Sequence, residues 1–324
     1  MLKEWKATEK PEEEELKKRL TAVREKLARQ QMLIKEKKVP VLVLMEGWGT
    51  AGKGSCIGQV IQNIDPRFFK VESMEKKTEE EERRPFLYRH FAKIPEAGKF
   101  VFLDSGWMGE TVGDYLRGEL KEAEYTKRIE SIRRFERQLT DNGYLVMKFF
   151  LHISEKEQKK RIKHLTEEKD TMWRVNRNDM WQNHHYEKCV DAFSSYMKDT
   201  SMPSAPWYIV DAKSKKWTEL QVLETLTQGI DIAFNNRDMA VPLLQNVFPL
   251  EKMPLLAEIP LDKELADEEY QEELKQLQTR LGELHNRLYR KKVPVIIAYE
   301  GWDAAGKGGN IKRITGALDP RGYE

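Results

Sequence analysis

A glycine-rich segment with a single lysine is the part of this sequence best suited to chemistry. The segment runs from Glu46 to Ser55 and reads EGWGTAGKGS. It follows an apolar run, residues 39–45, and precedes a stretch of helical character, residues 57–64. A strand that leads through such a turn into a helix presents backbone N–H groups and a lysine to an anion. The segment therefore predicts a P-loop that binds phosphate.

One position of this loop departs from the Walker A pattern. Gly54 stands where that motif has the Ser or Thr whose hydroxyl binds Mg²⁺. Ser55, one place later, would point elsewhere on the helix. We expect Gly52, Lys53 and Gly54 to contact phosphate.

The loop occurs twice in the chain. Residues 293–321 repeat residues 39–67 without a gap, each position displaced by 254, and about half of the positions are identical. The second loop reads EGWDAAGKGG, and its expected phosphate contacts are Gly306, Lys307 and Gly308. The duplication favours a binding function over the alternative, a tight turn that merely joins a strand to a helix.

The repeat also sets the expected domain organisation. A chain of 324 residues can hold one complete unit, residues 1–250, followed by a linker, a helix and the opening of a second unit, residues 251–324. The chain reaches Glu324 soon after the second loop. We expect either a fragment or a product whose second domain has only begun, which the coding sequence beyond Glu324 would decide.

Composition limits the partners. Charged residues make up 34% of the chain but nearly balance at +2, so we expect no nucleic-acid partner. Cys56 and Cys189 lie far apart without metal-ligand spacing, which indicates a reducing, intracellular setting. No apolar run approaches 18 residues, so we expect no membrane segment and a cytoplasmic location.

The N-terminal region predicts an amphipathic helix that is also repeated. Within residues 9–37, five apolar residues form one narrow stripe at helical spacing: Leu16, Leu20, Val23, Leu27 and Ile34. The same spacing returns 254 residues later as Tyr270, Leu274, Leu277, Leu281 and Leu288. The stripe indicates a surface helix packed on its own domain, and a contact between subunits or repeats is the alternative. We expect a homo-oligomer.

Further strands and helices alternate along the first unit. Residues 39–45, 100–104, 145–153 and 207–211 predict buried strands, separated by helical segments. The alternation, with a P-loop after the first strand, predicts a doubly wound, mostly parallel α/β fold of the nucleoside- or thymidylate-kinase type.

Two more features belong to the expected site. Asp104 ends a buried strand, and in such sheets that end faces the ligand, so Asp104 is a candidate metal ligand; a turn or helix-capping aspartate is the alternative. Between residues 167 and 181 the apolar periodicity is lost, and Lys169, Arg174 and Arg177 accompany a tryptophan. This segment predicts a helical lid over phosphates, with an exposed polar loop as the alternative.

The chain resembles the type 2 polyphosphate kinase family, most closely its tandem two-domain form. The resemblance rests on the paired GWxxAGKG loops, the Asp-Pro-Arg that follows each loop, and three further segments of the first unit: Phe135-Glu136-Arg137 with Gly143, Lys148 to Ser154, and Thr200-Ser201 through Ala205-Pro206-Trp207. These stretches span most of residues 39–211. The last two are specific to the family, whereas the loops occur in P-loop proteins generally.

The resemblance implies that inorganic polyphosphate donates a phosphoryl group to a nucleotide of the AMP, ADP or ATP type, reversibly and with Mg²⁺. In the family, one aspartate inside the loop and another after the second strand bind the metals, and lid arginines bind the polyanion. Carried over, Asp303 and Lys307 would be catalytic, Asp303 and Asp104 would bind metal, and Arg174 would bind phosphate.

The first copy departs from the family pattern. Gly49 replaces the loop aspartate that the second copy has as Asp303. The family segment Asp-Arg-Ser-Trp-Tyr-Asn-Arg becomes residues 104–110, where Ser105 and Glu110 replace both arginines. We therefore expect a degenerate first unit and catalysis in the second unit, of which these 324 residues contain only the opening, so that the isolated 324-residue chain can be inactive. A non-catalytic polyphosphate-binding or assembly module, and another P-loop kinase or NTPase, remain alternatives, and the acceptor nucleotide and preferred direction stay open.

Overall fold

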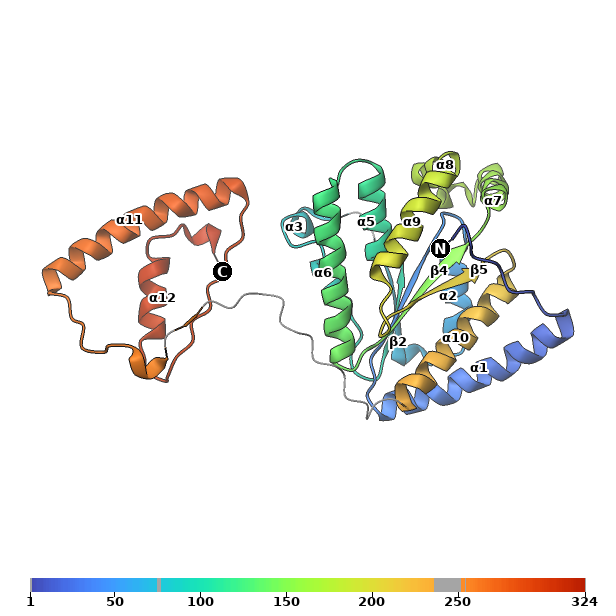
Figure 1. Cartoon of the computed structure of the whole chain (residues 1–324), viewed down its shortest axis with the longest axis horizontal. Coiled ribbons are helices and arrows are strands. Elements are labelled where there is room, and N and C mark those ends of the chain that lie inside the picture. The colour runs from blue at the N-terminus through green and yellow to red at the C-terminus, as the bar shows by residue number, and fades with distance from the viewer. Residues whose placement is uncertain (1, 75–76, 236–251, 254, 324) are drawn as a thin grey trace. The chain divides into compact units, whose positions relative to one another are not determined.

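The computed structural model describes residues 2–74, 77–235, 252–253 and 255–323, in two compact units, Met1–Pro242 and Leu243–Glu324 (Figure 1). The predicted domain boundary between residues 250 and 251 lies outside the described residues.

The first unit contains a five-stranded sheet in which every pairing is parallel, in the order β2-β3-β1-β4-β5. Its strands are β1 Val41–Gly47, β2 Phe69–Ser73, β3 Phe100–Asp104, β4 Leu145–His152 and β5 Trp207–Asp211. The predicted strand at 39–45 is the central β1, whose first six residues are buried, as expected of a strand covered on both faces. The prediction of a doubly wound α/β fold is confirmed.

Helices cover both faces of this sheet (Figure 1). One layer contains α1 Glu13–Glu36, α2 Lys53–Ile61 and α10 Lys215–Asn235. The other contains α5 Trp107–Leu116, α6 Glu122–Asp141 and α9 Tyr186–Thr200. Four further helices belong to this unit: α3 Glu79–Glu82, α4 Tyr88–Phe91, α7 Glu155–Glu167 and α8 Arg177–His184.

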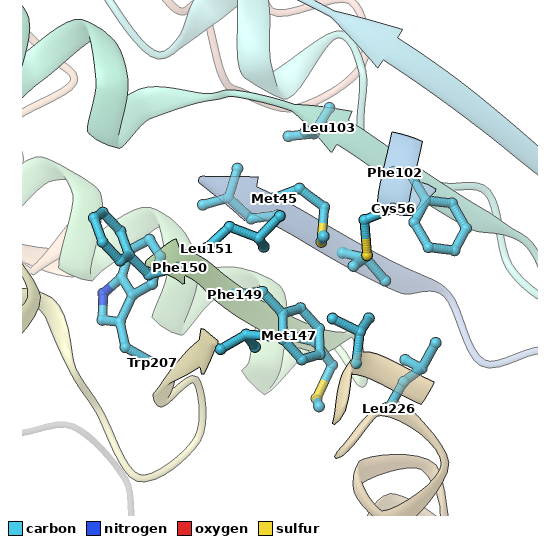
Figure 2. Close-up of a cluster of buried hydrophobic side chains, with 14 of the residues drawn as sticks. Met45, Cys56, Phe102, Leu103, Met147, Phe149, Phe150, Leu151, Trp207 and Leu226 are labelled. Carbon is cyan, nitrogen blue, oxygen red and sulfur yellow. The ribbon is translucent and has the colours of Figure 1, made fainter. Parts of the chain in front are cut away.

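The core of the first unit lies between the sheet and these helices. Figure 2 shows side chains of β1, β3, β4 and β5 packed together with Cys56 of α2 and Leu226 of α10. Burial raises the pKa of the Cys56 thiol to about 12, so this cysteine is a packing residue and not a reactive thiolate.

The apolar stripe of α1 packs on its own unit. All five of its residues are buried, and α1 contacts α10. Arg24 pairs with Glu219 and Arg19 with Glu224 across this contact. The interpretation of this segment as a helix packed on its own domain is confirmed for the first unit.

The second unit contains α11 Asp267–Lys291 and α12 Lys307–Thr315. Although α11 repeats the stripe of α1, none of its described residues is buried. Residues 293–300 repeat the sequence of β1 but form no strand, and Ile296 is 95% exposed. A strand needs a neighbouring strand to pair its backbone groups, and the described part of this unit contains none.

Candidate functional site

The P-loop of the first unit lies at the carboxyl end of β1, between the ends of β3 and β4. Gly47 ends the strand with φ 143°, and a Cβ there would lie 2.5 Å from the carbonyl oxygen of Leu151. Gly52 adopts φ 94° and precedes α2, whose first residue is Lys53. In open α/β sheets, ligands bind where the strand connections diverge in this way, and a helix N-terminus there favours an anion.

The second loop has the same backbone conformation. Gly301 and Gly306 have φ values of 156° and 81°, and Ala304 has 59° where Thr50 has 63°. Lys307 Nζ donates to the carbonyl oxygens of Gly301 and Trp302, both at 2.8 Å. The lysine thus folds over its own loop, and Gly308 follows it in α12.

Asp104 lies where the sequence predicted, beside the first loop. It pairs in register with Met45 of β1, and its Oδ2 would lie 3.2 Å from a Cβ at position 54. A residue with a side chain at position 54 would therefore contact this carboxylate. Gly54 leaves the space between the helix start and Asp104 open.

A buried polar network holds the turn that follows Asp104. Trp107 Nε1 donates to Glu136 Oε1 at 3.0 Å, and Lys148 Nζ lies 2.6 Å from Glu136 Oε2. Lys148 also donates to the Thr200 carbonyl, and Trp207 Nε1 donates to Thr200 Oγ1. Glu136, Lys148 and Thr200 come from the three separate segments that resemble the family, and they meet in this one network. The network fixes the position of the end of β3.

Glu46 is a second buried acid near the loop. Its Oε1 accepts hydrogen bonds from the backbone N–H groups of Gly106 and Gly109, at the start of α5. Burial raises the pKa of Glu46, while these hydrogen bonds and the charge of Lys53 oppose that shift. Glu46 thus joins the P-loop strand to the turn that follows Asp104.

A cavity of about 670 Å³ opens beside the first loop. Its lining includes six carboxylates and four cationic side chains: Glu46, Glu82, Glu110, Asp114, Glu119, Asp179, Lys53, Lys77, Arg89 and Arg117. The formal charge of the lining is therefore negative. A chain of phosphates is strongly anionic, so this lining would repel it unless bound cations neutralised part of the charge.

Most of the cations in this lining already pair with carboxylates. Lys77 lies 2.5 Å from Glu110, and Arg117 lies 2.6 Å from Asp114 and 2.9 Å from Glu119. Burial alone would raise the pKa of Glu110, but the nearby His90 ring, 3.7 Å away, and the pair with Lys77 hold that pKa at about 2. Glu110 stands where the family has an arginine. Its carboxylate is thus ionised, and its charge is balanced by Lys77 of the same unit.

The lid segment, defined here as residues 168–185, includes a short 3₁₀ helix, Met172–Arg174, and α8. Arg174 is exposed, stacks on Trp173 with 5.4 Å between the guanidinium carbon and the ring centroid, and does not line the cavity. The lid residues that do line it are Asn176, Asn178, Asp179, Trp181 and Gln182. A phosphate-binding role for Arg174 stays a prediction.

The two predicted metal ligands differ in their surroundings. Asp303 is exposed within the second loop, and its Oδ1 accepts the N–H of Ala304 at 3.0 Å. Its other oxygen is suited to Mg²⁺, which prefers carboxylate oxygens and retains several waters. In the first unit, Asp104 faces neither a loop aspartate nor a hydroxyl at position 54. Within the described residues, no group of three His, Cys, Asp or Glu side chains could hold a metal.

Sequence reasoning missed three residues around the first loop: Glu46, Asp179 and Gln182. Glu46 gave a signal, because the repeat preserves it as Glu300. Asp179 and Gln182 gave none, because they lie about 130 residues from the loop along the chain and meet it only through packing.

The parallel sheet and the glycine-rich loop at the end of its central strand define a P-loop protein of the kinase type. A model of the family described as Polyphosphate kinase 2 (PPK2) matches residues 10–238 and 264–324. The chain belongs to this family, so the resemblance seen in the sequence is confirmed. No helix of the described residues is long and apolar enough to cross a membrane.

Individual relatives agree with this assignment. The chain is 32% identical over 309 residues to a polyphosphate:AMP phosphotransferase of Pseudomonas aeruginosa. This alignment covers 93% of this chain and 62% of that protein. It is also 27% identical over 214 residues to an AMP/ADP-polyphosphate phosphotransferase of Meiothermus ruber. That alignment covers 65% of this chain and 80% of the other protein. The chain thus spans less than two thirds of the length of the first relative.

Solved structures of the family also match. A polyphosphate kinase 2 from Pseudomonas aeruginosa PA01 has a TM-score of 0.79 at 28% identity, covering 100% of this chain and 63% of the other. Polyphosphate Kinase 2 from Arthrobacter aurescens TC1 has a TM-score of 0.65 at 26% identity, covering 74% of this chain and 85% of the other.

Proposed function

We propose that the protein transfers a phosphoryl group between inorganic polyphosphate and a nucleotide, AMP or a nucleoside diphosphate, with Mg²⁺. The observation that supports this most is the family match over both repeats, together with the relatives named for this reaction. The second loop retains the aspartate and the lysine that phosphoryl transfer uses in this family, as Asp303 and Lys307.

In this reaction an oxygen of the nucleotide's terminal phosphate attacks the terminal phosphorus of polyphosphate. The bond from that phosphorus to the bridging oxygen breaks, and the shortened chain leaves with the electron pair. The transition state is loose and its charge lies on oxygens, so the protein contributes mainly position and positive charge.

The second loop supplies these contributions. Lys307 would turn from the carbonyls of Gly301 and Trp302 to the transferred phosphate, and the N–H groups at the start of α12 would bind its oxygens. Asp303 would hold Mg²⁺, which when bound neutralises charge on the phosphates.

We further propose that the first unit does not catalyse the transfer. Gly49 supplies no carboxylate, Ser105 and Glu110 supply no guanidinium groups, and the cavity lining carries more acids than cations. Each missing charged contact costs about 2–4 kcal/mol of transition-state stabilisation. The complete core of this unit favours a role in folding or assembly as the second candidate.

The test uses the purified full-length protein with polyphosphate, Mg²⁺ and, in separate reactions, AMP, ADP and GDP. We expect transfer to at least one nucleotide, and we expect Lys307→Ala and Asp303→Ala each to reduce its rate by about a thousandfold. Circular dichroism of both variants controls for folding. Transfer that needs ATP as donor and does not occur with polyphosphate, or full activity of both variants, would contradict the proposal.

A further inference from the structure

Two polar side chains from outside the first P-loop bind both backbone groups of Gly49. The N–H of Gly49 donates to Gln182 Oε1 of α8 at 3.0 Å, and its carbonyl accepts from Gln158 Nε2 of α7 at 3.3 Å. Gln158 is fully buried, and its Oε1 accepts from Asn183 Nδ2 at 3.1 Å. The peptide groups that flank Gly49 are therefore occupied by the chain's own side chains.

Asp179 fills the space that a side chain at position 49 would need. A Cβ on Gly49 would overlap Asp179 Oδ1 and would lie 2.6 Å from its Cγ and 2.9 Å from its Cβ. Asp179 is only 6% exposed and forms a capping box with Asn176, with hydrogen bonds of 2.9 and 3.0 Å. This box holds Asp179 at the start of α8, so the carboxylate can move aside only by giving up its hydrogen bond with the Asn176 N–H.

Arg161 of α7 extends the same connection to the next two loop residues. Its Nη1 donates to the carbonyl oxygens of Thr50 at 3.2 Å and Ala51 at 3.0 Å, while its Nη2 donates to that of Ala212 at 2.7 Å. The loop is thus joined to α7 through its carbonyls and to α8 through Gly49.

We propose that Gly49 locks the lid segment of the first unit onto its P-loop, so that the chain's own side chains hold the lid closed in place of a bound phosphate chain. The missing loop aspartate and the closed lid are then linked. A side chain at position 49 would occupy the space that the Asp179 carboxylate now fills, so the loop can have one or the other. Asp303 occupies the equivalent position of the second loop, so the same contact cannot form there.

Hydrogen exchange of the whole chain tests this proposal. In the wild type, amides of the lid segment and of Gly49 should exchange slowly, and added polyphosphate with Mg²⁺ should not slow them further. Gly49→Asp should accelerate exchange of the lid at least about tenfold, because the buried contacts are lost. The matched control is Gly58→Ala in α2, where no atom lies within 4 Å of the added Cβ, and it should leave the lid rate unchanged.

A second variant keeps the test decisive if Gly49→Asp does not fold. Gln182→Ala retains glycine at position 49 and removes only the acceptor of its N–H, so it should accelerate exchange at the lid and Gly49 by a smaller factor. Exchange in β4 should not change in either variant, which separates lid opening from unfolding. A lid that exchanges rapidly in the wild type and slows only with polyphosphate, or a lid rate unaffected by both variants, would overturn the proposal. None of these measurements depends on transfer activity.

Discussion

The two P-loops of this molecule share a backbone conformation but differ in almost everything around it. The first lies in a complete parallel sheet with a buried core, yet Gly49 lacks the carboxylate that the second loop has as Asp303. The second follows residues 293–300, which form no strand, and Trp302 is 83% exposed. The loop conformation is therefore compatible with the absence of a paired strand and with either Gly or Asp at this position.

The same comparison separates folding from chemistry within the first unit. The family residues that it retains, such as Glu136 and Lys148, are buried in its structural network. The residues that it has lost would have faced phosphate or metal. This division agrees with the proposal that the first unit keeps its fold but does not catalyse the transfer.

Breaking the buried pair should have the largest effect on stability. Lys148→Met leaves Glu136 as an unpaired acid with no exposed surface, so we expect the free energy of unfolding of the first unit to fall by about 3–5 kcal/mol. Urea denaturation measures this loss. The double variant Lys148→Met with Glu136→Gln should recover part of it, because no buried charge remains. A loss below about 1 kcal/mol in the single variant would show that the network is not structural.

The repeated helices offer a comparison of packed and unpacked stripes. Leu27 of α1 has no exposed surface, whereas Leu277 of α11 is 63% exposed. In the 324-residue chain, Leu27→Ala should cost about 2–5 kcal/mol of unfolding free energy through loss of burial and cavity formation. Leu277→Ala should change it by less than about 0.5 kcal/mol. Equal losses would mean that another surface covers the stripe of α11 in solution.

Restoring one family residue should not restore the site. Glu110→Arg would replace the acid that pairs with Lys77 by a second cation, beside a buried His90 ring whose pKa burial lowers; Lys77 and His90 now lie 2.5 and 3.7 Å from the Glu110 carboxylate. We expect a loss of about 1–3 kcal/mol of stability, measured by thermal unfolding, without tighter polyphosphate binding. Adding Lys77→Glu should recover the loss by reversing the pair. Tighter binding by Glu110→Arg alone would show that only one charge separates this site from a functional one.

Much of this arrangement could be predicted from sequence because it depends on local patterns. The apolar run of β1, the glycines of the loop and the acid at the end of β3 predicted the parallel sheet and a position of Asp104 at the end of the sheet that carries the P-loop. Each of these signals lies within one element and its immediate flanks.

The rest depends on contacts between distant segments. The charged segment at residues 167–181 predicted a basic lid, yet Arg174 stacks on Trp173 while Asp179 and Gln182 face the loop. Charge composition cannot specify which side of a short helix faces inward when its apolar periodicity is weak. The pairing of Lys77 with Glu110 also requires the fold, because neither residue forms a local pattern with the other.

The most direct test of the account is the rate of phosphoryl transfer from polyphosphate in the Lys53→Ala variant, measured beside Lys307→Ala in the same protein. Lys53 lines a cavity whose carboxylates outnumber its cations, so its loss should change the rate by no more than about threefold, while Lys307→Ala should reduce it by about a thousandfold. A loss from Lys53→Ala as large as that from Lys307→Ala would contradict the assignment of catalysis to the second unit.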